Sequence, residues 1–325
     1  MTGETGRRVL ITGGYGYVGG RVAQALTRTG TYAVSLGTRS TPAGAPSWLP
    51  AALTVTLEWS STEMLRRACA GADSIVHLAA MNGIESARDP VRALEVNGLQ
   101  SLRLLEAAIS ENVKRFIYLS TAHVYGAPLV GMIDERTLPR PARPYAITHK
   151  TAEDFVLGAA DAGRIEAIVL RLSNGFGAAA HAGVDGWMLL VNDLCRQAVT
   201  ERALTLASPG LQRRDFVTLE DVGRAVEHAL ALPVGQGGGL LFNLGGDAAL
   251  RVIDMAELIA VRCDAVLGFR PPIKRPLPRD GERSKELHYS SAKFQGTGFR
   301  LTKNHAAEID STLRLCVKAF GGMPA

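Results

Sequence analysis

The 325 residues include 46% hydrophobic side chains and carry a formal net charge of +5, which suits one large domain or two sharing an interface and excludes a disordered or fibrous chain. The basic residues are scattered, so we expect a small acidic ligand and no nucleic-acid partner. The sequence contains no signal-peptide core and no apolar run of about 18 residues, so we expect a cytoplasmic protein with no membrane partner.

The stretch Val9–Gly20, VLITGGYGYVGG, predicts a buried strand, a tight turn and the start of a helix over Arg21–Thr29. Gly13 allows a sharp turn, Gly16 lets the backbone approach a phosphate, and Gly19 lets helix and strand pack closely. The helix start offers free N–H groups and the positive end of a dipole, as a dinucleotide pyrophosphate requires. The cofactor contacts expected from this loop are Gly13, Tyr15, Gly16, Tyr17, Val18 and Gly19.

Apolar runs then alternate with helical patterns through the first half of the chain, which predicts an α/β fold with a Rossmann-like, doubly wound parallel sheet. Further strands are predicted at Tyr32–Leu36, Leu53–Leu57, Ser74–Ala79, Arg115–Ser120 and Ala167–Leu172. Helices are predicted at Pro90–Ser110 and Tyr145–Ala160. We assign residues 1–173 to this dinucleotide-binding domain.

The second half changes to loops, short strands and helices, and we expect residues 174–325 to form a smaller α/β substrate lobe. Segments near 214–232 are expected to return to the first domain. The predicted elements are helices Gly186–Thr200, Leu219–Leu232 and His305–Phe320, strand Asp215–Thr218, and a flexible run Gly235–Gly239. The four cysteines show no redox or zinc-ligand spacing, so we expect no metal.

The end of the second predicted strand bears on the choice of cofactor. NAD-specific folds usually place an acid there, which binds the ribose hydroxyls. This chain has Gly37 and Thr38, followed by Arg39, whose guanidinium suits a 2′-phosphate. A charge-assisted hydrogen bond contributes about 1.5–3 kcal/mol. The sequence therefore favours NADP(H), with NAD(H) as the alternative.

An ordered set of motifs resembles the extended short-chain dehydrogenase/reductase superfamily. After the glycine loop come HLAA from His77, EVNGLQSLRLLEAA around Asn97, FIYLSTAHVYG from Phe116 and PYAITHK from Pro144. RLSNGFG and RRDFVTLEDV further resemble the branch that contains sugar-nucleotide epimerases, dehydratases and ketoreductases.

The resemblance implies a role for particular residues. Thr121 would hydrogen-bond the reacting sugar oxygen, and Tyr145 would be the catalytic acid/base. Further cofactor contacts are implied at Glu58, Trp59, Leu78, Ala79, Ala80 and Asn97. Substrate contacts are implied at Asn174, Arg214, Arg279 and Glu282, whose charged members suit a nucleotide diphosphate sugar.

The chain departs from the family pattern in two places. Family dehydratases follow the Thr with Asp and Glu, but this chain has Ala122 and His123. A methyl group donates no proton, so we do not expect a 4,6-dehydratase, and we expect His123 to line the substrate pocket.

The second departure is His149, which stands where the family has the Lys of Tyr-x-x-x-Lys. Lys150 follows, but on a helix it lies about 140° from Tyr145, whereas His149 lies about 40° away. Lowering a phenol pKa from about 10 to about 7 takes roughly 4 kcal/mol. An imidazole can bind the nicotinamide ribose but is largely neutral at pH 7. We therefore expect His149 to reproduce the hydrogen bonds of the family Lys to the cofactor better than its positive charge.

The leading hypothesis is an NAD(P)-dependent enzyme that reduces a 4-keto nucleotide sugar, with Thr121, Tyr145 and His149 in the active site. One alternative is a nucleotide-sugar 4-epimerase with tightly held NAD. Another, suggested by His149, is a non-catalytic cofactor sensor or scaffold of the same fold. Family members often pair through a four-helix bundle, so we expect a homodimer built from Pro90–Ser110 and Tyr145–Ala160.

Overall fold

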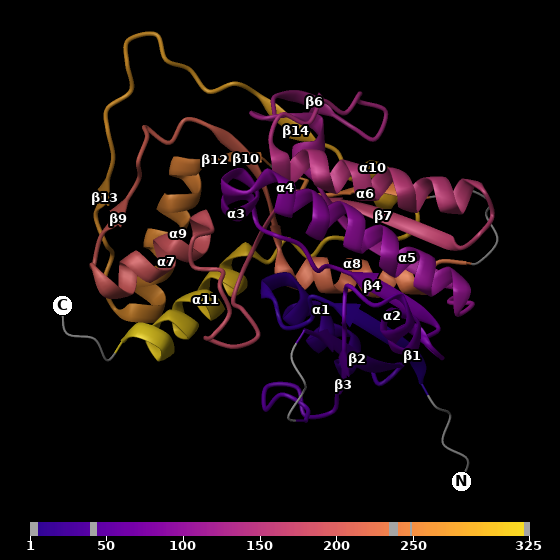
Figure 1. Ribbon diagram of the computed structural model, residues 1–325. Helices are drawn as coiled ribbons and strands as arrows, with labels where there is room; N and C mark the ends of the chain where they lie inside the picture. The colour runs from indigo at the N-terminus through magenta and orange to yellow at the C-terminus, as the bar shows by residue number, and fades with distance from the viewer. Residues whose placement is uncertain (1–5, 40–43, 234–239, 248, 322–325) are drawn as a thin grey trace.

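A parallel sheet of seven strands forms the centre of the molecule (Figure 1). The computed structural model describes residues 6–39, 44–233, 240–247 and 249–321. The strand order is β11-β7-β5-β4-β1-β2-β3, and every neighbouring pair is parallel. The strands are β1 (Arg7–Thr12), β2 (Tyr32–Thr38), β3 (Leu53–Thr56), β4 (Ser74–His77), β5 (Arg115–Thr121), β7 (Glu166–Leu172) and β11 (Leu240–Leu244). The predicted doubly wound α/β fold is confirmed.

The sheet has a hydrophobic core on each face, because successive side chains of a strand point to opposite sides. Val9 and Ile11 of β1 belong to one core, whereas Leu10 belongs to the other. The first core is covered by α1 (Tyr17–Arg28) and α8 (Leu219–Ala231), and the second by α2 (Thr62–Cys69), α5 (Gln100–Ser110) and α6 (Pro144–Asp161). Burial on both faces explains why the strands are almost continuously apolar.

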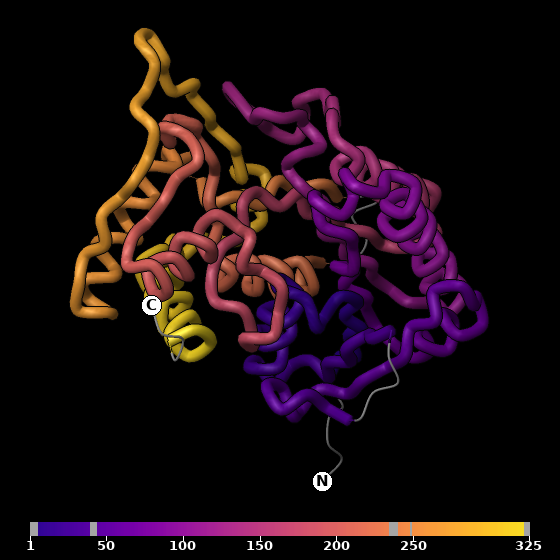
Figure 2. Tube along the Cα trace, turned by 60° about the vertical axis from the view of Figure 1, so that its left-hand side comes forward, coloured from indigo at the N-terminus to yellow at the C-terminus, as the bar shows by residue number. Residues whose placement is uncertain are grey.

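The C-terminal lobe has a third core, formed between helices α7 (Leu190–Thr200), α9 (Val252–Leu267) and α11 (His305–Phe320). Figure 2 shows this lobe beside the N-terminal domain. Its sheet contains β12 (Ala249–Arg251), β10 (Arg213–Thr218) and β8 (Asn174–Phe176). Two small sheets pair β13 (Ile273–Lys274) with β9 (Leu204–Thr205), and β14 (Leu287–Tyr289) with β6 (Gly131–Ile133). The remaining short helices are α3 (Gly83–Arg88), η2 (Ala122–Tyr125) and α10 (Ala292–Gln295).

Several boundaries differ from the prediction. The helix predicted over Pro90–Ser110 is divided into α4 (Pro90–Ala93), a π-helical segment η1 (Leu94–Leu99) and α5. Helix α7 begins at Leu190, because Leu189 has an extended backbone. Strand β11 extends the N-terminal sheet although it lies beyond residue 173. The predicted flexible run Gly235–Gly239 lies outside the described residues.

In the described part of the chain, no helix has both the length and the apolar character needed to cross a bilayer. The same residues contain no group of three or more His, Cys, Asp or Glu side chains placed to hold a metal ion. All four cysteines are buried free thiols.

Candidate active site

The glycine loop between β1 and α1 has the close backbone contacts expected of a phosphate-binding turn. Gly13 has φ +69°, and a Cβ there would lie 2.8 Å from the amide nitrogen of Ala79. The Gly16 N–H donates to the Gly13 carbonyl at 2.9 Å. A Cβ on Gly19 would lie 2.1 Å from that carbonyl oxygen. Gly13 and Gly19 therefore require the absence of a side chain, whereas a Cβ on Gly16 would lie 3.1 Å from the Gly13 carbonyl oxygen, a tight contact that a small shift relieves.

The start of α1 fits an anionic group. Gly16 is its N-cap and supplies no capping side chain, and the first turn contains no acidic residue. The N–H groups of this turn are therefore available to a bound anion, which the helix dipole also favours. The residues present fit the pyrophosphate of a nicotinamide dinucleotide.

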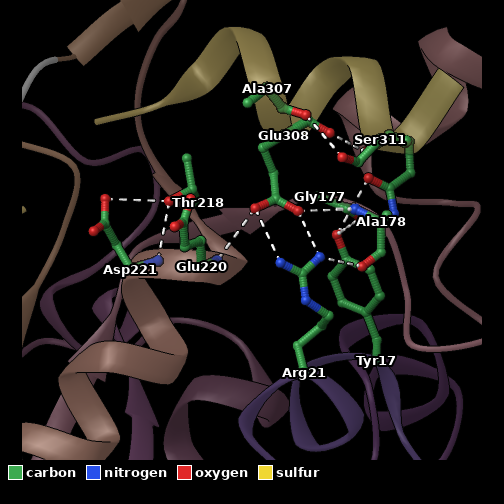
Figure 3. Close-up of polar contacts among 12 residues, drawn as sticks. Tyr17, Arg21, Gly177, Ala178, Thr218, Glu220, Asp221, Ala307, Glu308 and Ser311 are labelled. Atoms are coloured by element: carbon green, nitrogen blue, oxygen red, sulfur yellow. Dashed lines mark hydrogen bonds and ion pairs between the residues drawn. The ribbon is translucent and has the colours of Figure 1, made fainter. Parts of the chain in front are cut away.

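The side chains of the loop lie elsewhere. The Tyr17 hydroxyl donates to the carbonyl of Gly177 at 2.8 Å and to Asn192 Oδ1 at 3.2 Å (Figure 3). Tyr15 meets Trp48 edge to face, with ring centroids 6.0 Å apart, and Val18 packs against the first core. Cofactor contacts from these three positions, as predicted, would therefore come mainly from the backbone.

Thr121 and Tyr145 come together at the carboxyl end of β5, as their motif positions imply. Thr121 is the last residue of the strand, and Tyr145 lies in the first turn of α6. The Thr121 hydroxyl lies close enough to the phenol to affect its ionisation. Burial raises the pKa of Tyr145 above its ordinary value, and the interaction with the Thr121 side chain counteracts this by stabilising the phenolate.

His149 lies one helical turn after Tyr145, with the two ring centroids 4.2 Å apart. Its Nδ1 lies 2.8 Å from the backbone carbonyl of Tyr145. Because a carbonyl only accepts, we assign the ring proton to Nδ1, which leaves Nε2 as an acceptor. Burial lowers the pKa of His149 to about 4, so the imidazole is neutral at pH 7.

Lys150 points away from Tyr145, as the helical geometry predicts. Its Nζ forms an ion pair with Asp154 and lies 3.8 Å from Glu153 Oε1. Glu153 is fully buried and forms an ion pair with Arg171 of β7, which fixes α6 to the sheet. Lys150 therefore does not supply the charge that the family Lys provides.

A buried chain of hydrogen bonds fixes the ends of β1 and β4. Thr12 Oγ1 lies 2.6 Å from His77 Nδ1, and His77 Nε2 lies 2.7 Å from Ser101 Oγ. Ser101 donates to the carbonyl of Asn97 at 2.6 Å, so Nε2 carries the proton and Nδ1 accepts from Thr12. Burial lowers the pKa of His77 to about 3. These hydrogen bonds were not predicted from the sequence, although His77 belongs to the HLAA motif.

Asn97, a predicted cofactor residue, is buried in the π-helical segment η1. Its Oδ1 accepts from the Met81 N–H at 2.7 Å, and its Nδ2 donates to Thr148 Oγ1 at 3.0 Å. Thr148 in turn donates to the Tyr145 carbonyl at 3.1 Å. The side chain of Asn97 therefore connects the segment after HLAA to the helix that carries Tyr145.

Two arginines act on His123 electrostatically. Burial and then the charges of Arg214 and Arg143 lower the pKa of His123, so both guanidinium groups lie within electrostatic range of the imidazole. Arg213, the neighbour of Arg214, instead contacts the Ala249 carbonyl at 2.9 Å. Arg143 was not predicted as a site residue. It immediately precedes Pro144 and Tyr145 of α6, and this position next to the catalytic motif could have indicated it.

The predicted substrate residues lie on different elements. Asn174 on β8 is paired with Phe216 of β10 and donates to the Asp215 carbonyl at 2.9 Å, so it lies beside the strand of Arg214. Arg279 and Glu282 instead form an exposed turn, in which the Arg279 N–H donates to Glu282 Oε2 at 3.0 Å. Within the described residues no hydrogen bond or ion pair joins this turn to the other substrate positions.

The predicted adenosine contacts lie on the β2–β3 side of the sheet. Arg39 is exposed directly after β2, and a Cβ on Gly37 would lie 2.4 Å from Leu57 Cδ1, so a side chain at position 37 would crowd the core. Glu58 accepts from Ser60 Oγ at 2.6 Å, and these contacts lower its pKa. Trp59 packs against the second core.

The doubly wound sheet, the glycine loop and the Thr121–Tyr145 pair at the end of β5 are together typical of nucleotide-binding oxidoreductases. The model of the NAD dependent epimerase/dehydratase family matches residues 9–245, and the chain belongs to that family. This membership confirms the superfamily and branch indicated by the motifs.

Two curated relatives come from this family. A UDP-glucose 4-epimerase of Azospirillum brasilense is 34% identical over 266 residues, which cover 75% of each chain. A dTDP-glucose 4,6-dehydratase of Streptomyces niveus is 26% identical over 271 residues, 79% of this chain and 78% of that protein.

Two solved structures show the same fold. The UDP-glucuronic acid 4-epimerase of Bacillus cereus in complex with NAD superposes with a TM-score of 0.80 at 21% identity, covering 98% of this chain and 99% of that one. RMD of Pseudomonas aeruginosa complexed with NADPH gives 0.77 at 20% identity, covering 96% and 99%.

Proposed function

We propose that this protein carries out nicotinamide-dependent oxidation and reduction at C4 of a nucleotide-linked hexose, with 4-epimerisation as the first candidate. The observation that supports this most is the pair of Thr121 and Tyr145 at the end of β5, in the same parallel sheet whose strand β1 leads into the glycine loop. The 34% identity to a UDP-glucose 4-epimerase favours epimerisation over the reduction that the sequence alone favoured.

The chain supplies the proton chemistry. Thr121 Oγ1 orients the hexose hydroxyl, and Tyr145 Oη takes its proton in one direction and returns it in the other. The nicotinamide, when bound, supplies the hydride acceptor and donor. His149 Nε2 accepts a hydrogen bond from a ribose hydroxyl and so orients the cofactor without adding a charge.

Arg214 and Arg143 are the proposed binding groups for the diphosphate. Arg214 lies on the strand that pairs with the strand of Asn174, and Arg143 directly precedes Pro144 and Tyr145 of α6. Guanidinium groups suit phosphate oxygens because they donate in pairs. His123 lies within electrostatic range of both cations and remains neutral, because burial and their charges lower its pKa, so it acts as a pocket-lining hydrogen-bonding group. Neither it nor Ala122 reproduces the acid pair of a 4,6-dehydratase.

A second candidate is an NADP(H)-linked 4-ketoreductase. Arg39 supports it, because this exposed guanidinium directly follows β2, where an acid would repel a 2′-phosphate. A reductase consumes its cofactor as a substrate, whereas an epimerase regenerates it in each cycle. NADP(H) preference and a reductase reaction therefore belong together in this proposal.

Two assays distinguish the candidates. In the first, purified protein with added NAD is incubated with UDP-glucose, and chromatography measures formation of the C4 epimer. In the second, absorbance at 340 nm follows NADPH in the presence of a nucleotide-linked 4-keto sugar. Tyr145→Phe and Thr121→Ala should abolish or strongly reduce turnover in the productive assay. Cofactor binding without turnover in either assay would contradict the proposal and favour the cofactor sensor.

We also propose a homodimer through α4–η1 and α6. Large apolar side chains are exposed along these segments: Val91 (72%), Leu94 (50%), Leu99 (43%), Ile147 (46%) and Phe155 (46%). A monomer leaves this surface in water, whereas a four-helix bundle buries it. Light scattering of the wild type and of the Ile147→Glu, Phe155→Glu variant tests this, with a dimer expected only for the wild type.

A further inference from the structure

A network of polar contacts joins the helix of the glycine loop to the C-terminal lobe (Figure 3). Tyr17 begins α1, and its hydroxyl donates to Gly177 and to Asn192 of α7. Arg21 lies one turn further along α1 and donates to the carbonyl of Ala178 at 2.8 Å. Two side chains of α1 therefore contact the segment that directly follows β8.

Glu308 of α11 lies at the centre of this network. Its carboxylate accepts from Arg21 through both oxygens, at 2.6 and 3.2 Å. It also accepts from the backbone N–H of Ala178 and of Glu220, each at 3.2 Å. The Glu308 side chain is 3% exposed. One buried carboxylate thus joins α11 to α1, to the segment after β8 and to the first turn of α8.

The local backbone is shaped around this carboxylate. Gly177 has φ +146°, a conformation that favours glycine. A Cβ at this position would lie 2.2 Å from Glu308 Oε1. The segment therefore approaches Glu308 as closely as it does only because residue 177 has no side chain. Burial raises the pKa of Tyr17, so its hydroxyl remains a donor.

The network lies between the two expected binding sites. At one end, α1 begins at the glycine loop, whose N–H groups fit the cofactor pyrophosphate. At the other end, Gly177 and Ala178 follow Asn174, which is proposed to contact the substrate. A ligand that orders either end therefore also restrains the other, and a second ligand loses less conformational entropy when it binds.

We propose that Glu308, together with Tyr17 and Arg21, is a positioning residue that makes the binding of cofactor and of nucleotide sugar interdependent. This inference rests on the proposed function, because it requires that both ligands bind. The network touches neither reacting group, so its role is to fix the cofactor helix relative to the substrate lobe. Positioning of this kind affects how well the two ligands bind together more than how well each binds alone.

Isothermal titration calorimetry tests the inference. The dissociation constant for the preferred dinucleotide is measured with and without saturating UDP, and the ratio of the two constants is the coupling factor. In wild type we expect UDP to tighten dinucleotide binding at least about fivefold. In Glu308→Gln and Tyr17→Phe we expect the factor to fall toward one, with little change in the constant measured without UDP.

Asp310→Asn is the matched control. Asp310 also lies on α11 and forms a two-bond ion pair with Arg262, at 2.7 Å for each bond, but Arg262 belongs to α9 in the same lobe. This variant should lower the melting temperature while the coupling factor stays at the wild-type value. Tyr17→Phe keeps the ring and removes one hydroxyl, so it tests the inference even where Glu308→Gln folds poorly.

The outcomes separate the inference from the proposed function. A wild-type protein that binds neither dinucleotide nor UDP overturns the proposed function and the inference with it. A wild-type protein that binds both ligands without coupling overturns the inference alone. Wild-type coupling that persists in Tyr17→Phe and Glu308→Gln, or that disappears equally in Asp310→Asn, also overturns the inference.

Discussion

Replacing His149 with Lys should lower the pH at which Tyr145 acts as a base. In wild type the group beside the phenol is a neutral imidazole, because burial lowers the pKa of His149 to about 4. Burial also raises the pKa of Tyr145, and within the described residues only the interaction with the Thr121 side chain opposes this shift. We therefore expect the wild-type rate to rise with pH through the alkaline range.

The size of the change follows from the short separation of the two side chains. The ring centroids of Tyr145 and His149 are 4.2 Å apart, so we take about 5 Å as the separation between a lysine ammonium at position 149 and the phenol oxygen for a Coulomb estimate. At an effective dielectric constant of about 20, that charge stabilises the phenolate by ~3 kcal/mol. This energy corresponds to a decrease of roughly two pKa units, and at pH 7 to a rate up to about 100-fold higher.

The assay is the pH profile of kcat between pH 6 and 10.5, measured in whichever of the two reactions proves productive. His149→Lys should shift the ascending limb downward by about two pH units. Lys150→Met is the control and should leave the profile unchanged, because Lys150 pairs with Asp154 on another side of α6. If kcat of His149→Lys and of wild type depends on pH in the same way, the reasoning is refuted. It is also refuted if the wild-type kcat already rises with a midpoint near pH 7.

Three further outcomes can be measured. The free energy of unfolding, from urea titrations, should fall by about 2 kcal/mol per histidine between pH 7 and pH 5, because burial lowers the pKa of His149 to about 4 and of His77 to about 3. The contribution of the two neutral histidines to the free energy of unfolding is complete above pH ~6.5 and is lost as the pH falls. A free energy of unfolding that stays constant between pH 7 and pH 5 would contradict the prediction. Arg39→Ala should weaken NADP(H) binding about 10- to 100-fold and leave NAD(H) binding nearly unchanged; equal effects on both cofactors would remove the argument for a 2′-phosphate site. Gly19→Ala should destabilise the fold by about 1–3 kcal/mol and abolish dinucleotide binding, since its Cβ would lie 2.1 Å from the Gly13 carbonyl oxygen, and retained binding in calorimetry would contradict this role.

The features that depend on local residue patterns, and on the order of those patterns along the chain, could be predicted from the sequence. Strands buried on both faces are apolar throughout, so β1, β2, β5 and β7 could be located within a few residues. The last amphipathic helix was predicted with its observed bounds, His305–Phe320. The direction of Lys150 followed from the fixed angle per residue of a helix, which tertiary contacts do not change.

Other features depended on contacts between residues far apart in the chain. The helix over Pro90–Ser110 was predicted as continuous, but a π-helical segment interrupts it, and the buried side chain of Asn97 there bonds to Met81 and Thr148. No periodic pattern indicates such an interruption. Likewise, the sequence did not indicate that Arg279 and Glu282 form an exposed turn, in which the Arg279 N–H donates to Glu282, and their predicted role in substrate binding stays a prediction.

The family, the glycine loop and the replacement of Lys by His149 could all be identified from local patterns of residue types. The charge at position 149 depends on the folded chain, since the neutral state of His149 results from burial by segments distant in sequence. The same holds for the contact between Arg21 and Glu308, which lie at opposite ends of the chain. The energy of an ion pair and the pKa of a side chain depend on surroundings that only the folded chain brings together.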